Sequence, residues 1–199
     1  MKQTFPQVYL VRHGETAWSI SGQHTGRTDI ALTGRGEHAA QELSTRLKGL
    51  SFAKVFTSPL QRARQTSDLA GFGASAEADP NLMEWDYGDY EGRRTVDIRA
   101  ERPGWRLFED GCPGGETLVE VATRADRVIA RIRALESDVL VFAHRDILRI
   151  LIASWIALPA LSSAARIPLP GAVSSATVFA NACVDIDIEP PLVITDPIV

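Results

Sequence analysis

Cysteine is scarce in this 199-residue chain, which contains only Cys112 and Cys183. The two lie far apart and form neither a disulfide framework nor a CxxC pair, so we expect a reducing compartment, the cytoplasm. Long apolar runs are also missing. The most apolar window, 147–161, is interrupted by arginine, serine and proline, is too short to span a bilayer, and predicts a buried helix. Residues 1–6 are polar and lead directly into a predicted strand, so we expect no signal peptide.

Basic residues are not in excess either. The net charge is −4, with 23% charged and 45% hydrophobic residues, which is typical of a globular protein that binds neither nucleic acid nor membrane. Any anion site must therefore be local. The length suits one sizeable core and no stretch resembles a linker, so we expect a single domain over residues 1–199. Composition leaves the oligomeric state open between monomer and homodimer.

Several familiar catalytic motifs are absent. The chain has no GxxxxGK[ST] loop, no GxGxxG after a strand, no HExxH and no GxSxG. His24 and His38 have no partners at ligand spacing, and the acidic residues form no cluster with the histidines. We therefore expect no metal and no cofactor. His38 is interpreted as a solvated helix position and His24 as a contact at the rim of a site.

Short apolar runs alternate with helical patterns along the chain, which predicts an α/β fold, a three-layer α/β/α sandwich with a mostly parallel central sheet. Loops are expected over 16–30 and 93–115, and the segment of about 80–115 is expected to form an insertion over the site. Strands are predicted at 8–11, 54–57, 76–79, 139–143, 176–180 and 184–188, followed by a proline-rich tail from Pro190. Helices are predicted at 32–50, 59–70 and 116–135, the last with Val119, Ala122, Ala125, Ile129 and Ile132 facing inward.

Two of these strands end on a histidine. Residues 8–11 run straight into Arg12 and His13, and residues 139–143 end on His144. Because the carboxyl ends of parallel strands meet at one edge of the sheet, the two imidazoles should lie together there. Arginine offers a planar fork to phosphate oxygens, and uncharged histidine is a nucleophile near neutral pH. The pattern favours a phosphoryl site, although an isolated Arg-His-Gly more often only solvates a loop.

Arg62 is expected at the same edge. It lies in the first turn of the helix predicted over 59–70, for which Ser58 and Gln61 suggest a capping box. The helix dipole disfavours a cation at this end, so an anion between Arg62 and the free N–H groups would explain its presence. The alternative is an exposed Arg62 that pairs with Asp68.

The acidic and aromatic segment 81–92 supplies candidate general acids and bases, provided that burial raises one carboxyl pKa towards neutrality. The residue chemistry alone does not choose among its four carboxylates, which are Glu84, Asp86, Asp89 and Glu91.

Taken together, six motifs in order resemble the histidine phosphatase superfamily, the phosphoglycerate-mutase-like proteins. They are Leu10 to Thr16 (LVRHGET), Thr25-Gly26, Leu32-Thr33, Ser58 to Ala63 (SPLQRA), Gly114-Gly115-Glu116 and Ala143-His144. The segments around Trp18, Glu84 and Asp110 are most similar to the sedoheptulose-bisphosphatase-like sugar phosphatases.

The resemblance implies a mechanism without a metal. His13 would become phosphohistidine, Arg12, Arg62 and His144 would grip the phosphoryl oxygens, and Glu84 would be the proton donor. The substrate would be a small phosphorylated metabolite, a sugar (bis)phosphate. Substrate contacts are expected from Ser19, Thr25, Gly26, His24 and Arg145.

Two positions depart from the family pattern. Ser19 stands where the mutases have Asn, and Arg145 stands where the family usually has Gly after the second histidine. We expect Arg145 to have a helical backbone and to turn its guanidinium to the rim of the site. A phosphatase is favoured because the segment Arg93 to Gly115 is short and carries acidic residues, whereas the mutases have a longer basic insertion. A mutase-type phosphoryl transfer and a non-catalytic phosphate-binding module are the alternatives.

Overall fold

A computed structural model describes residues 7–135, 137–155 and 176–179. Its centre is a five-stranded sheet in the order β3-β2-β4-β1-β5, in which each neighbouring pair is parallel. The strands are β1 (Val8–Arg12), β2 (Lys54–Thr57), β3 (Ala76–Ala78), β4 (Val139–Ala143) and β5 (Ala176–Phe179). The predicted α/β fold with a parallel sheet is thereby confirmed.

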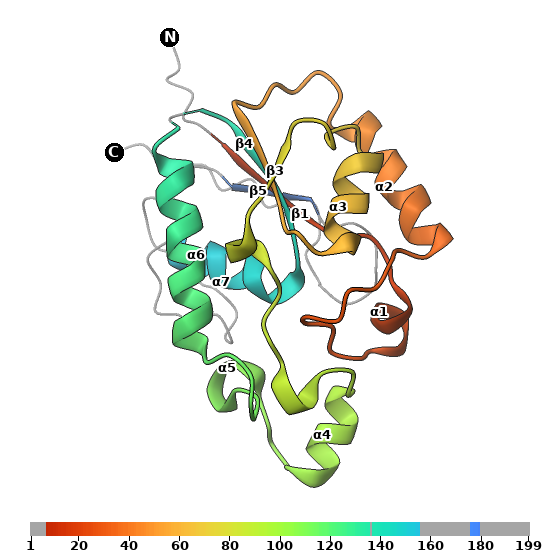
Figure 1. Ribbon diagram of the computed structural model, residues 1–199, viewed down its shortest axis with the longest axis vertical. Helices are drawn as coiled ribbons and strands as arrows, with labels where there is room; N and C mark the ends of the chain where they lie inside the picture. The colour runs from red at the N-terminus through yellow and green to blue at the C-terminus, as the bar shows by residue number, and fades with distance from the viewer. Residues whose placement is uncertain (1–6, 136, 156–175, 180–199) are drawn as a thin grey trace.

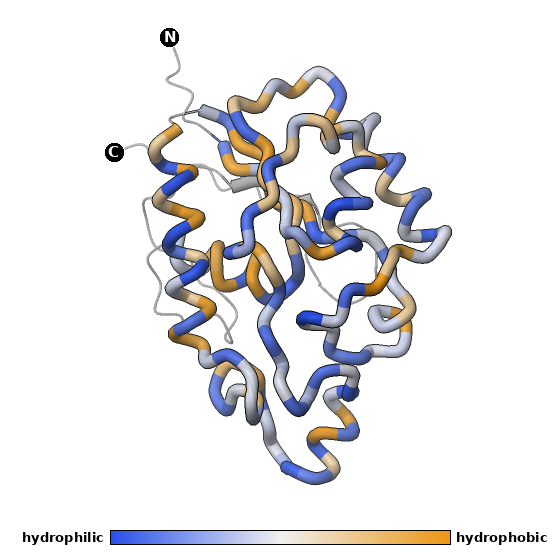
Figure 2. Tube along the Cα trace, viewed as in Figure 1, coloured by the Kyte–Doolittle hydropathy of each residue, from blue (hydrophilic) through white to orange (hydrophobic). Residues whose placement is uncertain are grey.

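Helices cover both faces of the sheet and make the three layers visible in Figure 1. The helices α2 (Gly34–Arg46) and α3 (Gln61–Leu69) lie on one face, and α6 (Leu118–Arg133) and α7 (Arg145–Trp155) lie on the other. Side chains alternate along a strand, so β1 sends Val8 and Leu10 into the core under α6 and α7 and Tyr9 and Val11 into the core under α2. This double burial explains why the strands are uninterrupted apolar runs, orange in the centre of Figure 2.

The helix α6 shows where local patterns succeed and where they fail. Thr117 caps it, and Glu120 completes a capping box. Ala125, Ile129 and Ile132 are buried as predicted. Val119 was placed inward wrongly, because it is 73% exposed, and the first-turn core contact comes from Val121 instead.

The predicted capping box at the start of α3 is also wrong. The N-cap residue is Leu60, which makes no side-chain cap, and the Gln61 N–H donates instead to the carboxylate of Asp29, 2.6 Å away. A residue distant in sequence thus does what Ser58 was expected to do. Ser58 is buried; its hydroxyl oxygen accepts the Leu60 N–H at 3.3 Å rather than that of Gln61, and it has a second partner that is described below.

The segments expected to be loops contain short helices. These are α1 (Ala17–Ser21), α4 (Thr95–Glu101), α5 (Leu107–Asp110) and the 3₁₀ turns η1 (Pro80–Leu82) and η2 (Gly88–Tyr90). They are too short to show a periodicity in sequence, yet Ile98, Trp105 and Phe108 bury their side chains in the core shared with α6 and α7. Figure 1 shows α1, α4 and α5 on the side of the sheet to which the strands point.

Four sequence predictions fall outside the described residues: the strand at 184–188, the tail from Pro190, the expectation that Cys183 forms no disulfide, and the end of the apolar window 147–161. The described part of that window belongs to α7, whose Ile147, Leu148, Ile150 and Leu151 are buried as expected. Among the residues that the structure describes, no helix has both the length and the apolar character that crossing a bilayer requires.

Candidate active site

The two strand-end histidines lie next to each other. Arg12 pairs with Ala143 in the register of β1 and β4, and the His13 N–H donates to the Ala143 carbonyl at 3.0 Å. The ring centroids of His13 and His144 are 5.1 Å apart. The expectation that both imidazoles reach one sheet edge therefore agrees with the structure.

His13 is buried and held in one tautomer. Its Nδ1 lies 2.8 Å from the carbonyl oxygen of Gly14, which can only accept a hydrogen bond, so Nδ1 carries the proton and Nε2 keeps its lone pair. Burial and the charges of Arg62 and Arg12 hold the pKa of His13 well below its usual value. The imidazole is thus neutral at physiological pH, as a nucleophile must be.

His144 orients Arg62. The Arg62 Nε donates to Nδ1 of His144 at 3.1 Å, so the His144 Nε2–H is left to donate to Ser58 Oγ at 2.7 Å. Burial and the charge of Arg62 lower the pKa of His144 well below its usual value. Both ring nitrogens of His144 therefore bond to protein groups, Arg62 and Ser58. The contact between His144 and the phosphoryl oxygens, which the family resemblance implies, stays a prediction.

Arg62 has no exposed surface, so the alternative of a solvated ion pair with Asp68 is wrong. Its terminal nitrogens donate to the carbonyls of Thr25 and Gly26 at 3.0 and 2.9 Å, and to that of Thr28 at 2.9 Å. Carbonyl partners bear no formal charge, so the guanidinium remains a buried cation beside His13.

Glu84 is the buried carboxyl group among the four candidates, with 4% of its surface exposed. Its oxygens accept from the N–H groups of Trp85 and Ile147 at 3.0 Å and of Asp146 at 3.1 Å, which places it at the start of α7. Burial and the negative charge of Asp146 raise its pKa, against the effect of the N–H donors. Glu91 instead accepts from the N–H groups of the loop that follows α1.

Arg145 begins α7, so its backbone is helical, as expected. Its guanidinium contacts both carboxylate oxygens of Asp146 at 3.3 Å. Asp146 is fully buried, contacts Arg149 at 3.3 Å and accepts the Tyr87 hydroxyl at 2.7 Å. Burial acts to raise the pKa of Asp146, but the charges of Arg145 and Arg149 hold it below its usual range.

The other expected substrate contacts hold loops in place. The Ser19 hydroxyl donates to the carbonyl of its N-cap residue and accepts that residue's N–H, and the Thr25 hydroxyl donates to the Gln23 carbonyl. The Gly26 N–H donates to Glu91, and its carbonyl accepts from Arg62. Substrate binding by these residues stays a prediction.

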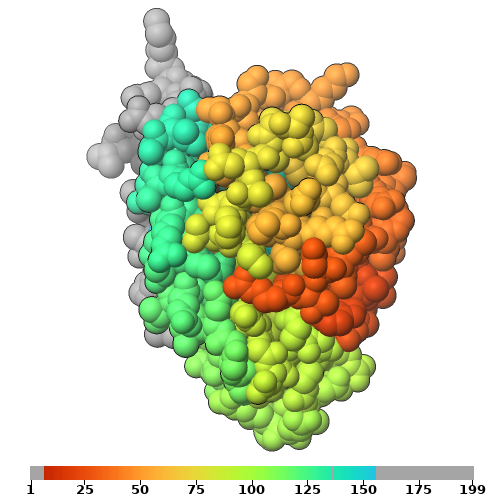
Figure 3. Space-filling model, viewed as in Figure 1, coloured from red at the N-terminus to blue at the C-terminus, as the bar shows by residue number. Residues whose placement is uncertain are grey.

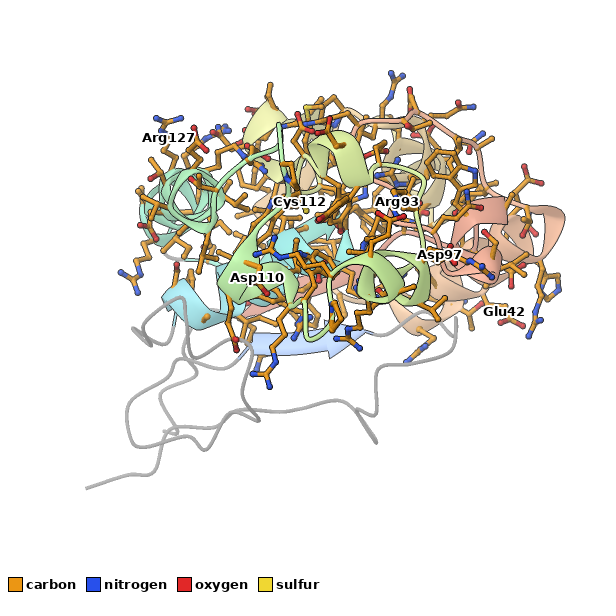
Figure 4. All side chains as sticks on the ribbon, turned by 90° about the horizontal axis from the view of Figure 1, so that it is seen from below. Glu42, Arg93, Asp97, Asp110, Cys112 and Arg127 are labelled. Atoms are coloured by element: carbon orange, nitrogen blue, oxygen red, sulfur yellow. The ribbon has the colours of Figure 1, made fainter. Side chains whose placement is uncertain are left out.

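His24 joins the loop after α1 to the segment 80–115. Its ring packs against Tyr87 and Trp105, with centroids 4.7 and 5.6 Å apart, and Nε2 lies 3.2 Å from the Thr95 hydroxyl. Burial lowers its pKa. In Figure 4, which views the molecule from this side, the labelled Asp97 and Asp110 mark α4 and α5 of the same segment.

Sequence reasoning missed the residues that fix the Glu84 backbone. Arg124, on α6, donates to the carbonyls of Asn81, Met83 and Glu84 and forms a bidentate ion pair with Glu116 at 2.8 and 2.9 Å. Figure 3 shows the segment that carries these carbonyls, in yellow, lying between α6 and the orange N-terminal elements. The motif Gly114-Gly115-Glu116 marked one half of this ion pair, but no local signal marks Arg124.

Among the described residues, no group of three or more His, Cys, Asp or Glu side chains is placed to hold a metal ion.

Comparison with known proteins identifies the family. Residues 8–183 match the histidine phosphatase superfamily, branch 1. The chain is 42% identical over 173 residues to an acid phosphatase of Mycobacterium tuberculosis, with 83% of each chain covered. It is 40% identical over 193 residues to the sedoheptulose 1,7-bisphosphatase of Saccharomyces cerevisiae, over 79% of this chain and 70% of that protein.

The fold is shared as well. A solved structure from a Mycobacterium tuberculosis open reading frame aligns with a TM-score of 0.73 at 38% identity, and the match covers 78% of this chain and 82% of that one. Fold and site together define an α/β enzyme that acts on phosphate monoesters. The chain belongs to the histidine phosphatase superfamily, and the resemblance first seen in its motifs is confirmed.

Proposed function

We propose that this protein hydrolyses a phosphate monoester of a small metabolite, a sugar mono- or bisphosphate, through a phosphohistidine on His13. The observation that carries the proposal is the state of His13, which is buried, neutral and protonated on Nδ1, and whose pKa is lowered by burial and by the charges of Arg62 and Arg12. A neutral imidazole with Nε2 unprotonated has the lone pair that an in-line attack on phosphorus requires.

In the first step the His13 Nε2 lone pair forms the bond to phosphorus, and the bond from phosphorus to the sugar oxygen breaks. The charges of Arg12 and Arg62 stabilise the negative charge on the phosphoryl oxygens, and His144 keeps the Arg62 guanidinium in position. Glu84 gives its proton to the departing oxygen. Its raised pKa supports this role, because the acid must hold a proton near neutral pH.

In the second step ionised Glu84 takes a proton from water, and the water oxygen attacks phosphorus. The bond from phosphorus to Nε2 breaks, phosphate leaves, and both residues return to their starting states. The similarity to a sedoheptulose bisphosphatase supports a sugar phosphate as substrate. Transfer to a substrate hydroxyl in place of water is the alternative, and relatives named as probable phosphoglycerate mutases keep it open.

The test is to trap the intermediate. Labelled sugar phosphate, mixed with the enzyme and quenched in alkali, should leave one base-stable, acid-labile adduct per chain. His13→Ala should lack it. His38→Ala is the matched control, because His38 is an exposed histidine on α2 that pairs only with Glu42 in the described part of the chain. An adduct that survives in His13→Ala would disprove the proposed nucleophile, and label recovered in a second sugar rather than in phosphate would indicate a mutase.

A further inference from the structure

The chain that carries the His13 imidazole leaves the sheet directly after β1. The His13 backbone N–H still donates to the Ala143 carbonyl of the neighbouring strand, at 3.0 Å. The next residue, Gly14, is buried, and its carbonyl oxygen accepts the His13 Nδ1–H at 2.8 Å. The conformation of Gly14 therefore decides how the imidazole is turned and which ring nitrogen keeps its lone pair.

Thr66, on α3, binds the backbone N–H of Gly14. The Thr66 hydroxyl donates to the Arg62 carbonyl at 2.7 Å, because a carbonyl oxygen can only accept. A lone pair of the same hydroxyl oxygen accepts the Gly14 N–H at 3.0 Å. Thr66 has no exposed surface and Gly14 is buried, so an unpaired N–H at this point would be costly.

Helix α2 holds the same turn from its own side. A Cβ on Gly14 would lie 2.6 Å from the Gly36 carbonyl oxygen, so the backbone of α2 packs directly against the glycine. The Glu15 carbonyl accepts the N–H of Thr33, the N-cap residue of α2, at 2.9 Å. The turn after β1 is thus held by α2 at the Gly14 Cα and at Glu15, and by the Thr66 hydroxyl at the Gly14 N–H.

We propose that Thr66 is a positioning residue for the nucleophile: its hydroxyl holds the peptide between His13 and Gly14 and thereby keeps the Gly14 carbonyl aimed at the His13 Nδ1–H. This inference rests on the proposed function, since it concerns the nucleophile of the same site. Without the hydroxyl, the buried Gly14 N–H has to turn towards another acceptor, and the carbonyl of the same residue moves with it. The imidazole then loses the partner that fixes its tautomer and its direction.

Ser67 provides a matched control on the same helix. It follows Thr66 directly, is equally buried, and its hydroxyl has no hydrogen-bond partner among the described residues. Ser67→Ala therefore removes a buried hydroxyl without removing a hydrogen bond. Thr66→Val replaces a hydroxyl by a methyl group of similar size and removes the acceptor for the Gly14 N–H, whereas Thr66→Ser keeps that acceptor.

The experiment measures single-turnover phosphorylation of the enzyme by a hexose phosphate and by nitrophenyl phosphate. A displacement of about 1 Å costs up to about a hundredfold in rate, so Thr66→Val should slow both reactions about tenfold or more, and to the same extent. Equal slowing indicates the nucleophile, because proton donation by the general acid matters mainly for the poorer leaving group. Ser67→Ala and Thr66→Ser should react at the rate of the unmodified enzyme.

A second readout does not depend on turnover. The ring nitrogen chemical shifts of His13, measured by NMR, report which nitrogen carries the proton. In Thr66→Val the share of the Nε2–H tautomer should rise, whereas Ser67→Ala should match the unmodified protein. Thr66→Ala, with the same two readouts, serves if the valine variant does not fold.

Four results would overturn the inference. They are unchanged nitrogen shifts of His13 in Thr66→Val, an unchanged rate of phosphorylation, slowing confined to the hexose phosphate, and the same changes in Ser67→Ala. If the unmodified enzyme reacted with neither ester, the proposed function itself would fail. That outcome is distinct, because it appears before any substitution and the NMR comparison still decides whether Thr66 orients His13.

Discussion

Arg124 is predicted to position Glu84, and Arg124→Met tests this. The substitution keeps most of the apolar stem but removes well-formed donors to the carbonyls of Asn81 and Met83, at 2.7 and 2.9 Å, and a longer one to Glu84. Two lost hydrogen bonds at about 1 kcal/mol each, plus a largely buried bidentate ion pair with Glu116, give a destabilisation of about 3 kcal/mol. Glu116 is not left alone, because Arg27 lies 3.2 Å away.

The activity should fall further than the stability alone explains. A carboxyl group displaced by about 1 Å loses much of its acid catalysis, and that term is worth roughly 10²–10⁴ in rate. Single-turnover release of the alcohol, with enzyme in excess, isolates the phosphorylation step. We expect Arg124→Met to slow release of an alkyl leaving group about a hundredfold and release of a nitrophenolate, which needs little protonation, much less.

Arg131→Met is the matched control. Arg131 lies two turns further along α6. Its guanidinium pairs with Glu77 and Asp79 and lies over the ring of Phe56, whereas that of Arg124 bonds to Glu116 and to the carbonyls of Asn81, Met83 and Glu84. It should lose stability in urea without any dependence on the leaving group. Equal slowing of alkyl and aryl substrates in Arg124→Met, or the same pattern in Arg131→Met, would refute the positioning role. Arg124→Lys, which keeps the charge, serves if the methionine variant does not fold.

Two further predictions concern the edge of the sheet. The folded-state pKa values of His13 and His144 lie well below the usual 6.5, chiefly through burial, so the unfolded chain binds more protons below that pH. Stability is therefore complete above about pH 7 and is lost as the pH falls. Each of these two histidines contributes about 1 kcal/mol of loss between pH 6.5 and 5.5. The pKa of His24 is also lowered, so His144→Asn should make the pH slope of urea unfolding shallower without removing it, and an unchanged slope would contradict the cause given. Gly14→Ala should reduce both stability and turnover, because its Cβ would lie 2.6 Å from the carbonyl oxygen of Gly36, a backbone atom that cannot move aside. Gly22→Ala is the control, because its Cβ would have no atom within 4 Å and its positive φ should lower the free energy of unfolding by only about 1 kcal/mol. A Gly14→Ala variant as stable and active as Gly22→Ala would show that close packing at Gly14 is unimportant.

The sequence by itself determined the parts of the protein that depend on local pattern. Uninterrupted apolar runs identified β1 and β4 as strands buried on both faces, and the residues directly after them, His13 and His144, were expected at one edge because parallel strands share a carboxyl edge; the strand order then makes β1 and β4 neighbours. The apolar period of α6 was also visible in the sequence. The prediction failed only at Val119, in the first turn of the helix, where the exposed Val119 comes before the first buried residue, Val121.

Only the tertiary structure decided which charged groups are buried. Glu84 could not be chosen from four carboxylates because its burial depends on the N–H groups of Asp146 and Ile147, more than sixty residues later in the chain. The enclosure of Arg62 likewise depends on the carbonyls of the loop at 25–28. A hydrophobic period in the sequence predicts which residues of a single helix or strand are buried. The desolvation of Glu84 and Arg62, the ion pairs of Asp146 and the contacts of Arg124 form only when separate elements pack together in the folded protein.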